Sequence, residues 1–436
     1  AENAEEAVAS LAMSRCLFLL VHEPASVTPF IEQGGLGRVT TIMLNHVTVE
    51  DIICQGFLCV SKLGSSLSLD AAEESLRVVR RCQLHHVLKP SVICHGLQTA
   101  WAVLQDHPRE GLAYLQDIAE ELGFVEVAIG ADKLARLMPP PNTWGYTGDE
   151  LAYSAHGFLT MVASENEELK GTLLDRGLLI DALQSFEERG QGDDVLFQLL
   201  RCERGFAQFV EMCGCNRVVK VLRAHMTDIQ TVTACLSVIN AALRFSCHGR
   251  AWRRARDQLA DEGVMTAVLH ALTLHPADLD VNVGVNYALW FIADGSPLLQ
   301  HLCVQGDAHL AVASSLQRFV SSSAVLTATF GGVMALAKSC RRIRQVVARH
   351  IPPDIVAHIM HANSDPSVQC NGCCAIASLS RGCPQTQCRA ISVGALSLAV
   401  RALVHFPTDA DIQADALDTL DAVASGLRPA LSWLHA

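Results

Sequence analysis

Cysteines and histidines gather late in the chain at a spacing that raises the question of a metal site. Cys370 and Cys373 form a C-x-x-C pair, Cys374 follows directly, and His358 and His361 lie just upstream. Thiolate and imidazole groups are ligands that zinc binds in proteins. No second C-x-x-C pair follows, and the i, i+4 spacing within the group is that of helical neighbours. Small thiols buried in a packed helix are therefore the favoured interpretation, and metal binding stays open.

No nucleotide-binding or catalytic signature accompanies these residues. The patterns G-x-G-x-x-G, G-x-x-x-x-G-K-[ST], G-x-S-x-G and H-E-x-x-H are all absent. Histidines such as His275, His361 and His405 stand at the ends of expected helices, where the helix dipole accounts for them. The sequence therefore predicts a protein that is not an enzyme and that needs no cofactor.

Length and composition narrow the class of protein. A chain of 436 residues is too long for one compact core, which predicts several domains or an extended repeat. The formal net charge of −12 disfavours nucleic acid as the main ligand. The 17 irregularly spaced cysteines predict a reducing compartment, which we take to be the cytoplasm. No stretch approaches the ~18 apolar residues of a membrane span. The first residue is not Met, which is compatible with a processed product or a piece of a longer protein.

A glycine that follows an acidic or polar residue and precedes a helical apolar pattern recurs along the chain. It occurs at Gly34, Gly177, Gly263, Gly306 and Gly394. The interval from Gly263 to Gly306 is 43 residues, and the next interval, 88 residues, is twice 44. A second column follows about 18 residues later, where a polar turn leads into Ile52, Val281, Val325, Val368 and Ile412. A period of 43 to 44 residues is typical of armadillo and HEAT repeats.

The presumed third helices end in a shared pattern, seen in NYALWFIADG (286–295), GVMALAKS (332–339) and AIASLSRG (375–382). In this pattern the chain resembles the armadillo repeat family, most strongly from about residue 260 to 426. The resemblance implies an all-α, right-handed α-solenoid of about nine or ten units, whose third helices line a concave groove. The tryptophan–asparagine ladder of the nuclear-import members is missing, which disfavours that role.

The expected organisation has five parts. These are a capping helix over 1–22, irregular armadillo-like repeats over 23–136, a Pro-rich loop over 137–150, armadillo-like repeats over 151–426, and a tail or cap over 427–436. The loop is predicted because three consecutive prolines cannot continue a helix. The segment 64–135 is helical in pattern but irregular in period.

The repeat frame places a set of candidate partner-binding residues in the groove. They are an aromatic pair, Tyr287 and Phe291, then Asn371, Cys374 and Ser378, and an acidic end formed by Asp411, Asp415 and Asp418. An aromatic platform beside acidic residues would hold an apolar helix with a basic tail. Packing between repeats is the alternative role of the aromatic pair. Asn282, Asn286 and Trp290 share a neighbouring face and could bind a peptide backbone instead.

Two arginine-rich segments form a candidate basic edge. They contain Arg250, Arg253, Arg254 and Arg256 in the first, and Arg341, Arg342 and Arg344 in the second. Both segments fall at expected first helices, which would place them along one edge of the solenoid. Solvated arginines whose stems cover apolar surface are the plain interpretation. An edge that binds acidic surfaces, such as tubulin tails or membrane head groups, is the functional one.

The expected function is a non-enzymatic scaffold that binds a protein partner along the groove. The low charged fraction, 18%, suggests that much of the surface is covered, which favours a subunit of a multiprotein complex, cytoskeletal assemblies included. A regulatory armadillo region within a larger multidomain protein is the alternative.

Overall fold

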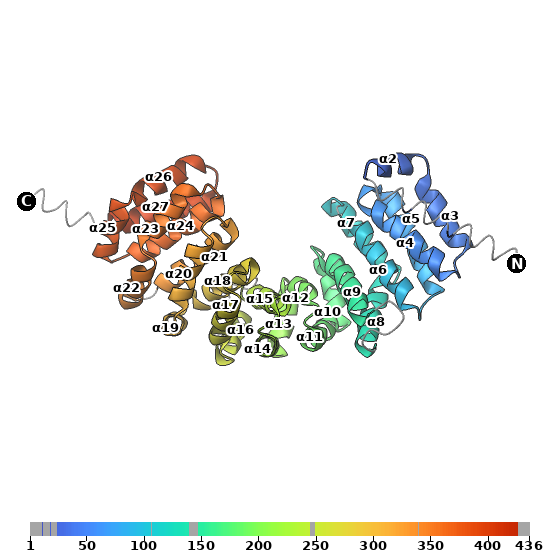
Figure 1. Cartoon of the computed structure of the whole chain (residues 1–436), viewed down its shortest axis with the longest axis horizontal. Coiled ribbons are helices and arrows are strands. Elements are labelled where there is room, and N and C mark those ends of the chain that lie inside the picture. Colours follow the sequence, from blue (N-terminus) through green and yellow to red (C-terminus); the bar gives the residue numbers. More distant parts are fainter. Residues whose placement is uncertain are drawn as a thin grey trace, which may run out of the picture. The chain divides into compact units, whose positions relative to one another are not determined.

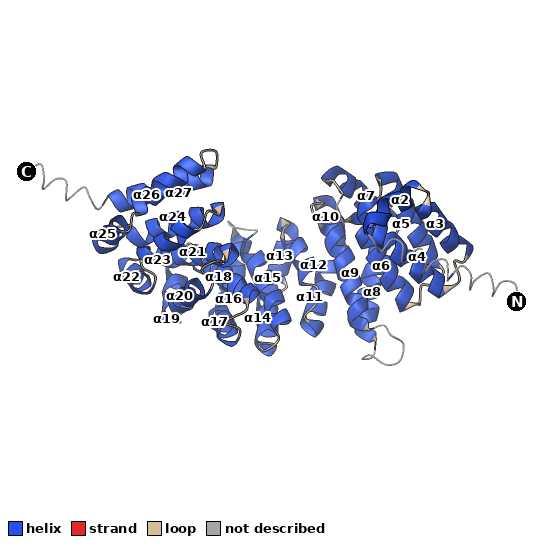
Figure 2. Cartoon of the chain, turned by 45° about the horizontal axis from the view of Figure 1, so that its top comes forward, coloured by secondary structure: helices blue, strands red, loops and turns tan. Residues whose placement is uncertain are grey.

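The computed structural model describes Leu11, Phe18 and residues 24–105, 107–138, 147–244, 249–338 and 340–425 (Figure 1). Within these residues there are 26 α-helices, one short 3-10 helix at Gly64–Ser66 and no strand (Figure 2). The predicted all-α solenoid class is confirmed. The chain divides into two compact units, Ala1–Gly205 and Phe206–Ala436, which we call unit 1 and unit 2.

Unit 1 contains four stacked repeats in its described part. Its helices are α2 (Pro24–Glu32), α3 (Gly35–Asn45), α4 (Glu50–Leu63), α5 (Leu69–Leu84), α6 (Pro90–Leu104), α7 (Arg109–Glu121), α8 (Phe124–Leu137), α9 (Gly148–Ala163), α10 (Glu167–Asp175), α11 (Leu178–Arg189) and α12 (Asp193–Leu200). Three repeats consist of a first, a second and a third helix. The other repeat has only α5 and α6, because a single helix of 16 residues replaces the first two. This replacement explains the irregular period between residues 64 and 135.

Unit 2 contains five three-helix repeats. Its helices are α13 (Glu203–Glu211), α14 (Gly214–Ala224), α15 (Ile229–Arg244), α16 (Arg250–Asp261), α17 (Val264–Leu274), α18 (Leu279–Ala293), α19 (Pro297–Gln305), α20 (Ala308–Arg318), α21 (Ser323–Ala337), α22 (Arg341–His350), α23 (Pro353–Ala362), α24 (Pro366–Ser380), α25 (Pro384–Ser392), α26 (Ala395–His405) and α27 (Ala410–Ala424). The third helices α15, α18, α21, α24 and α27 pack side by side in that order (Figure 1).

The third helices pack through a face of residues at i, i+4, i+8 and i+11. In α18 this face is fully buried at Val281, Val285 and Leu289. Each such side chain contributes about 1.5–3 kcal/mol of burial free energy. Small residues let neighbouring third helices approach, since a Cβ added at Gly284 of α18 would lie 2.9 Å from the Leu236 Cβ of α15. The sequence thus allows close helix contact through rows of apolar residues with glycines between them.

In unit 2, the polar residue three places before Val281, Val325, Val368 and Ile412 is a helix N-cap. The carboxylate of Asp278 accepts a hydrogen bond from Val281 N at 2.9 Å, and that of Asp409 accepts one from Ile412 N at 3.0 Å. Such a bond satisfies one of the amide groups that have no partner within the first turn of a helix. The polar turn therefore marks where these four third helices begin, whereas Val49, before Ile52, offers no side-chain acceptor.

The repeating glycine marks the turn between first and second helices, where the chain enters the left-handed region. Gly34, Gly177, Gly263 and Gly394 have φ between +66° and +80°. Gly306 does not: its φ is −86°, and Asp307, at +61°, takes the left-handed position. Asp is one of the few residues with a side chain that tolerate this region. The turn lies where the glycine pattern indicates, but its left-handed residue is one position later in the chain. Cys213, at φ +56°, serves the same purpose in the α13–α14 turn, which the glycine pattern missed.

Buried glutamines tie first helices to the ends of third helices. The Gln116 amide donates to Met161 O at 2.8 Å and to Ser164 O at 2.9 Å. Gln300 and Gln387 make the equivalent bond in unit 2, to Ala335 O and Ala422 O, both at 2.9 Å. The last four carbonyls of a helix have no partner within it, and stacking removes many of them from water. The glutamines supply that partner.

Histidines at the ends of second helices tie one repeat to the preceding one. His86 Nε2 lies 2.8 Å from Val47 O in unit 1, and His275 Nε2 lies 2.7 Å from Met226 O in unit 2. Each accepting carbonyl belongs to the second-to-third helix loop of the preceding repeat. His275 thus has a specific hydrogen bond in addition to the helix-dipole interaction that the sequence suggested.

Several predicted boundaries shift. Helix α8 continues through Leu137 and α9 begins at Gly148, so the loop predicted over 137–150 is shorter at both ends. A capping box between Thr147 and Glu150 starts α9. Residues 139–146 of that loop and the predicted tail or cap at 427–436 lie outside the described residues. Of the predicted capping helix 1–22, only Leu11 and Phe18 are described, and both are helical.

None of the described helices is by itself long and apolar enough to cross a membrane. The pair α25 and α26 reaches that length and composition only together, and it is bent by 65° at the junction.

Replacing Gln116 by Met keeps the size of the side chain but removes the donor to Met161 O and Ser164 O. We expect a loss of about 1–3 kcal/mol in the free energy of unfolding, because Ser164 O loses the Gln116 donor and Met161 O keeps only its bonds from Ser164. Urea unfolding followed by circular dichroism measures the loss. Gln184→Met is the matched control, since Gln184 is exposed and bonds only to the neighbouring Glu188 among the contacts resolved. Equal stabilities of the two variants would contradict the assigned role of Gln116.

Candidate functional site

A pocket of about 430 Å³ opens on the face of unit 2 that the third helices form. We call it the third-helix pocket. Four of the predicted groove residues line it: Tyr287 and Phe291 of α18, Asn371 of α24 and Asp411 of α27. The structure therefore brings together side chains from helices that are far apart in the sequence. Arg244 at the end of α15 lines the opposite side of the same pocket.

Three aromatic rings form one wall of the pocket. The ring centroids of Tyr287 and Phe291 lie 5.8 Å apart, those of Tyr287 and Trp290 lie 5.8 Å apart, and those of Trp290 and Phe291 lie 5.3 Å apart. All three side chains are half-buried. The sequence placed Trp290 on a neighbouring face, but it belongs to this aromatic cluster. The wall offers a large, partly exposed apolar surface with few internal degrees of freedom.

Gly331 on α21 makes room for the aromatic cluster. A Cβ added at Gly331 would lie 2.1 Å from Trp290 Cε3, which is far inside van der Waals contact. The absence of a side chain at Gly331 thus fixes where the indole can lie. The signal for this was present in the repeat frame, where Gly331 occupies the same column as Tyr287, one repeat later.

The polar residues of the pocket come from α24 and α27. Asn371 Nδ2 donates to Thr327 O of α21 at 3.1 Å, which holds the amide against the neighbouring third helix. Asp411 is exposed in the first turn of α27. Asp409, the N-cap of α27, also lines the pocket. The α27 end of the pocket is therefore acidic, whereas the α15 end carries the guanidinium of Arg244.

The cysteines that suggested a metal site interact with an aspartate instead. Cys370 Sγ lies 2.9 Å from Asp415 Oδ2 and donates to it. Burial and then the negative charge of Asp415 raise the pKa of the Cys370 thiol and of the Cys374 thiol. Protonated thiols are poor metal ligands and poor nucleophiles at neutral pH. Among the described residues, no group of three or more His, Cys, Asp or Glu side chains is arranged to hold a metal ion.

Other predicted groove residues lie elsewhere. Ser378 is buried, with 9% of its surface exposed, because α24 is packed closely between α21 and α27. Asp418 is exposed but pairs with Arg381, whose Nη2 lies 2.6 Å from Asp418 Oδ2. This pairing offsets the acidic charge predicted there. Neither residue lines the third-helix pocket.

The prediction that Asn282 and Asn286 could bind a peptide backbone is wrong. Both residues are buried, at 1% and 0% exposure. Asn286 Nδ2 donates to Ser315 Oγ at 3.1 Å, and Ser315 Oγ lies 2.9 Å from Asn282 Oδ1. The two amides are therefore used to join α18 to α20, and no peptide could reach them.

The arginines of the predicted basic edge divide into two kinds. Exposed side chains occur at Arg250, Arg253 and Arg254 in the first helix α16, and at Arg341 and Arg342 in the first helix α22. Arg256 instead packs over the ring of Trp252, at 4.4 Å from its centroid. Arg344 donates to Ala337 O at 3.0 Å and to Arg381 O. Arg256 and Arg344 thus have structural contacts that the sequence pattern did not reveal.

A buried polar cluster in unit 1 was missed by the sequence analysis. Asp132 Oδ1 lies 3.0 Å from both His156 Nε2 and Ser185 Oγ, and Arg136 pairs with Oδ2 at 2.7 Å. Burial raises the pKa of Asp132, but His156 and Arg136 lower it more, so it stays below its usual value. Because Ser185 donates to the carboxylate rather than to the imidazole, the histidine does not activate it as a nucleophile. The cluster joins α8, α9 and α11.

Comparison with solved structures identifies the fold. An engineered protein of known crystal structure superimposes with a TM-score of 0.68 at 15% identity, over 95% of this chain and 94% of its own. A structure from work on a phosphorylation switch that controls the interaction between cadherin and beta-catenin gives a TM-score of 0.49 at 12% identity, over 94% and 87% of the two chains. A designed armadillo repeat protein in complex with the peptide (KR)4 gives 0.42 at 15% identity, over 67% and 99%. No protein-family model and no curated protein matches the chain. At these identities the similarity establishes the fold alone.

Substitution of Gly331 by Ala tests the position of the aromatic cluster. The new Cβ would overlap the indole of Trp290, so we expect a loss of about 1–3 kcal/mol in the free energy of unfolding and a changed near-ultraviolet circular dichroism signal. Gly332→Ala is the matched control, because its Cβ would meet only Val312 Cγ2, at 3.7 Å, and Asn286 O, at 3.8 Å. That control should gain up to about 1 kcal/mol from helix propensity. A neutral Gly331→Ala would show that Trp290 lies elsewhere.

Substitution of Asp415 by Asn tests the electrostatic control of Cys370 and Cys374. Removing the negative charge stabilises the thiolates, so the pKa of both thiols should fall. Alkylation by iodoacetamide at pH 9, followed by mass spectrometry, should then be faster at both cysteines by up to about tenfold. Asp418→Asn, which removes the partner of Arg381, should leave the alkylation rates unchanged. Equal rates in all three proteins would argue against the Asp415 interaction.

Proposed function

Because the chain is an armadillo-like α-solenoid, we propose that it is a non-enzymatic scaffold that binds a protein partner in the third-helix pocket of unit 2. The observation that carries the proposal is the composition of this pocket. Five successive third helices, or the turns that precede them, contribute to it, and a half-buried aromatic wall stands beside the half-buried Asp409 and the exposed Asp411. Partly buried aromatic residues are enriched where proteins bind one another.

The chemistry of the pocket specifies the kind of segment that fits. An apolar side chain of the partner would pack on Tyr287, Trp290 and Phe291. A neighbouring Lys or Arg would be attracted both by the faces of the rings and by Asp411. Arg244 at the other end disfavours a second cation there and so gives the bound segment a direction. Asn371 is positioned to bond to a backbone group of the partner, because one side of its amide is already held by Thr327 O.

We also propose that the scaffold works in a reducing compartment such as the cytoplasm, as a subunit of a larger assembly. The support is compositional: 17 cysteines at irregular spacing and a charged fraction of 18%. A regulatory region of a longer multidomain protein would use the same pocket in the same way.

A second candidate function rests on the exposed arginines of the first helices. Arg253 and Arg254 on α16, and Arg341 and Arg342 on α22, are available to an acidic surface such as a tubulin tail or lipid head groups. Binding of this kind would be salt-sensitive and independent of the aromatic cluster. The third-helix pocket is favoured over it because the pocket combines shape, apolar surface and charge.

The proposal is tested with a fluorescent extended peptide of alternating leucine and arginine, measured by anisotropy. We expect binding that Trp290→Ala and Asp411→Lys each weaken by about tenfold or more, since they remove the aromatic wall and reverse the acidic charge. A peptide with glutamate in place of arginine should bind much more weakly. The combined variant Arg253→Glu, Arg254→Glu, Arg341→Glu and Arg342→Glu serves as the control for the basic edge and should bind normally. Unchanged binding in both pocket variants would contradict the assignment of the pocket. Binding of the glutamate peptide that the combined variant abolishes would instead favour the second candidate.

A further inference from the structure

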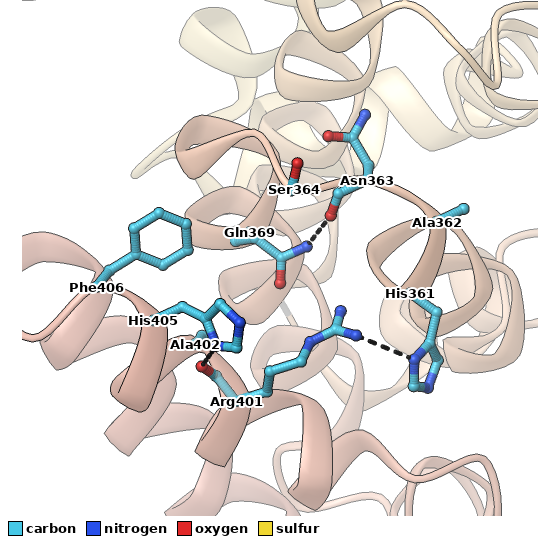
Figure 3. A pocket seen from close by; sticks show the side chains of 9 residues that line it. All are labelled: His361, Ala362, Asn363, Ser364, Gln369, Arg401, Ala402, His405 and Phe406. Carbon is cyan, nitrogen blue, oxygen red and sulfur yellow. Dashed lines mark hydrogen bonds between the residues drawn. The ribbon is translucent and has the colours of Figure 1, made fainter.

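A second pocket, of about 390 Å³, lies in unit 2 on the other side of the beginning of α24 (Figure 3). It is formed by the end of α23, the loop that leads into α24, and the end of α26. Gln369 of α24 lines this pocket, whereas the next two residues, Cys370 and Asn371, line the third-helix pocket. The two pockets therefore share a helix turn but no lining residue.

The second pocket arises where the histidine link between repeats is missing. His275, at the end of the second helix α17, bonds to Met226 O in the loop of the preceding repeat. The residue that follows α26 in the corresponding position is Phe406, whose ring has no N–H to donate. The loop residues Asn363 and Ser364 of the preceding repeat and the ring of Phe406 instead line an open space.

Cationic and donor groups point into this space. Arg401 Nη2 donates to Met360 O at 2.7 Å, which fixes the guanidinium, and Nη1 lies 3.5 Å from His361 Nδ1 (Figure 3). Acceptance at Nδ1 leaves the His361 proton on Nε2, where it is available to donate. His405 adds a second imidazole, whose Nδ1 donates to Arg401 O at 3.0 Å, so that Nε2 of the neutral ring is an acceptor. No carboxylate lines the pocket.

The nearest acidic residues in the sequence are committed to helix caps. Asp365 Oδ1 accepts from Ser367 N at 2.9 Å and from Val368 N at 3.2 Å. Asp409 Oδ1 accepts from Ile412 N at 3.0 Å. Each carboxylate is stabilised by the positive end of the helix that it caps, and neither lines the second pocket. The second pocket therefore presents one guanidinium and two imidazoles with no carboxylate among its lining residues.

We propose that this second pocket binds a phosphoryl group, presented either on a phosphorylated side chain of a partner or as free phosphate. A tetrahedral oxyanion suits donors that converge from different helices, here Arg401 of α26 and His361 of α23. Ser364 adds a hydroxyl donor, and the ring of Phe406 walls one side.

The proposal is tested by isothermal titration calorimetry with inorganic phosphate, with a phosphoserine-containing peptide and with the same peptide unphosphorylated. We expect inorganic phosphate and the phosphoserine peptide to bind and the unphosphorylated peptide not to bind. Arg401→Gln should weaken binding by about tenfold, through loss of a charge-assisted hydrogen bond. Tighter binding of the phosphopeptide assigns the site to a phosphorylated partner, and tighter binding of inorganic phosphate assigns it to the free ion.

Three further variants keep the test decisive. His361 is exposed, so His361→Phe should fold normally, and it should weaken binding by about threefold. This variant tests the site even if Arg401→Gln disrupts the packing of α23 against α26. Arg318→Gln removes an exposed arginine from the last turn of another second helix and should bind as the parent protein does. Trp290→Ala should also bind phosphate normally, which separates this proposal from the third-helix pocket. No binding of either phosphorylated probe, or equal losses in Arg401→Gln and Arg318→Gln, would overturn the proposal.

Discussion

Backbone carbonyls at the ends of short helices are the groups on which this solenoid depends, because stacking the repeats removes them from water. Apolar faces drive the stacking, but a carbonyl left without a partner costs about 1–3 kcal/mol. Gln116, Gln300 and Gln387 donate to the ends of third helices, and His86 and His275 donate to the loops of preceding repeats. These bonds require one register between neighbouring repeats, whereas apolar contacts alone would allow helices to slide. Polar side chains therefore hold the third helices in fixed positions.

A fixed register turns differences between repeats into binding surfaces. The same column of the third helices carries Tyr287 in α18, Gly331 in α21, Cys374 in α24 and Asp418 in α27. Since neighbouring helices lie at constant spacing, the small residue opens the space into which Trp290 fits. The indole of Trp290, part of the aromatic wall of the third-helix pocket, therefore lies where it does because Gly331 has no side chain.

The sequence predicted those parts of the molecule that rest on local rules. The armadillo-like frame, the polar turns that precede Val281, Val325, Val368 and Ile412, and four pocket residues (Tyr287, Phe291, Asn371 and Asp411) all follow from helical spacing and turn chemistry. Errors occurred where a partner from another element decides the outcome. Asn282 and Asn286 serve a structural role because Ser315, on a second helix, bonds to both. Arg344 has a structural role because it donates to the backbone carbonyls of Ala337 and Arg381. Spacing along one helix cannot reveal such partners. The turn at Asp307 was misplaced for a different reason, since Gly306 offered the commoner left-handed residue next to it.

The third-helix pocket and the second pocket both border the first turns of α24, and this has a consequence for how they recognise ligands. The turn is fixed by Pro366, by the Asp365 cap and by the Gln369 amide, which donates to Met360 O at 2.7 Å and to Asn363 O at 2.5 Å. A ligand in either pocket therefore meets a preorganised helix start rather than a loop that must be ordered on binding, which lowers the entropic cost of association. Selectivity then resides in the side chains on the two sides of that turn. On one side are aromatic rings and Asp411; on the other are Arg401, His361 and His405, in the place where other repeats use a histidine only to join themselves together.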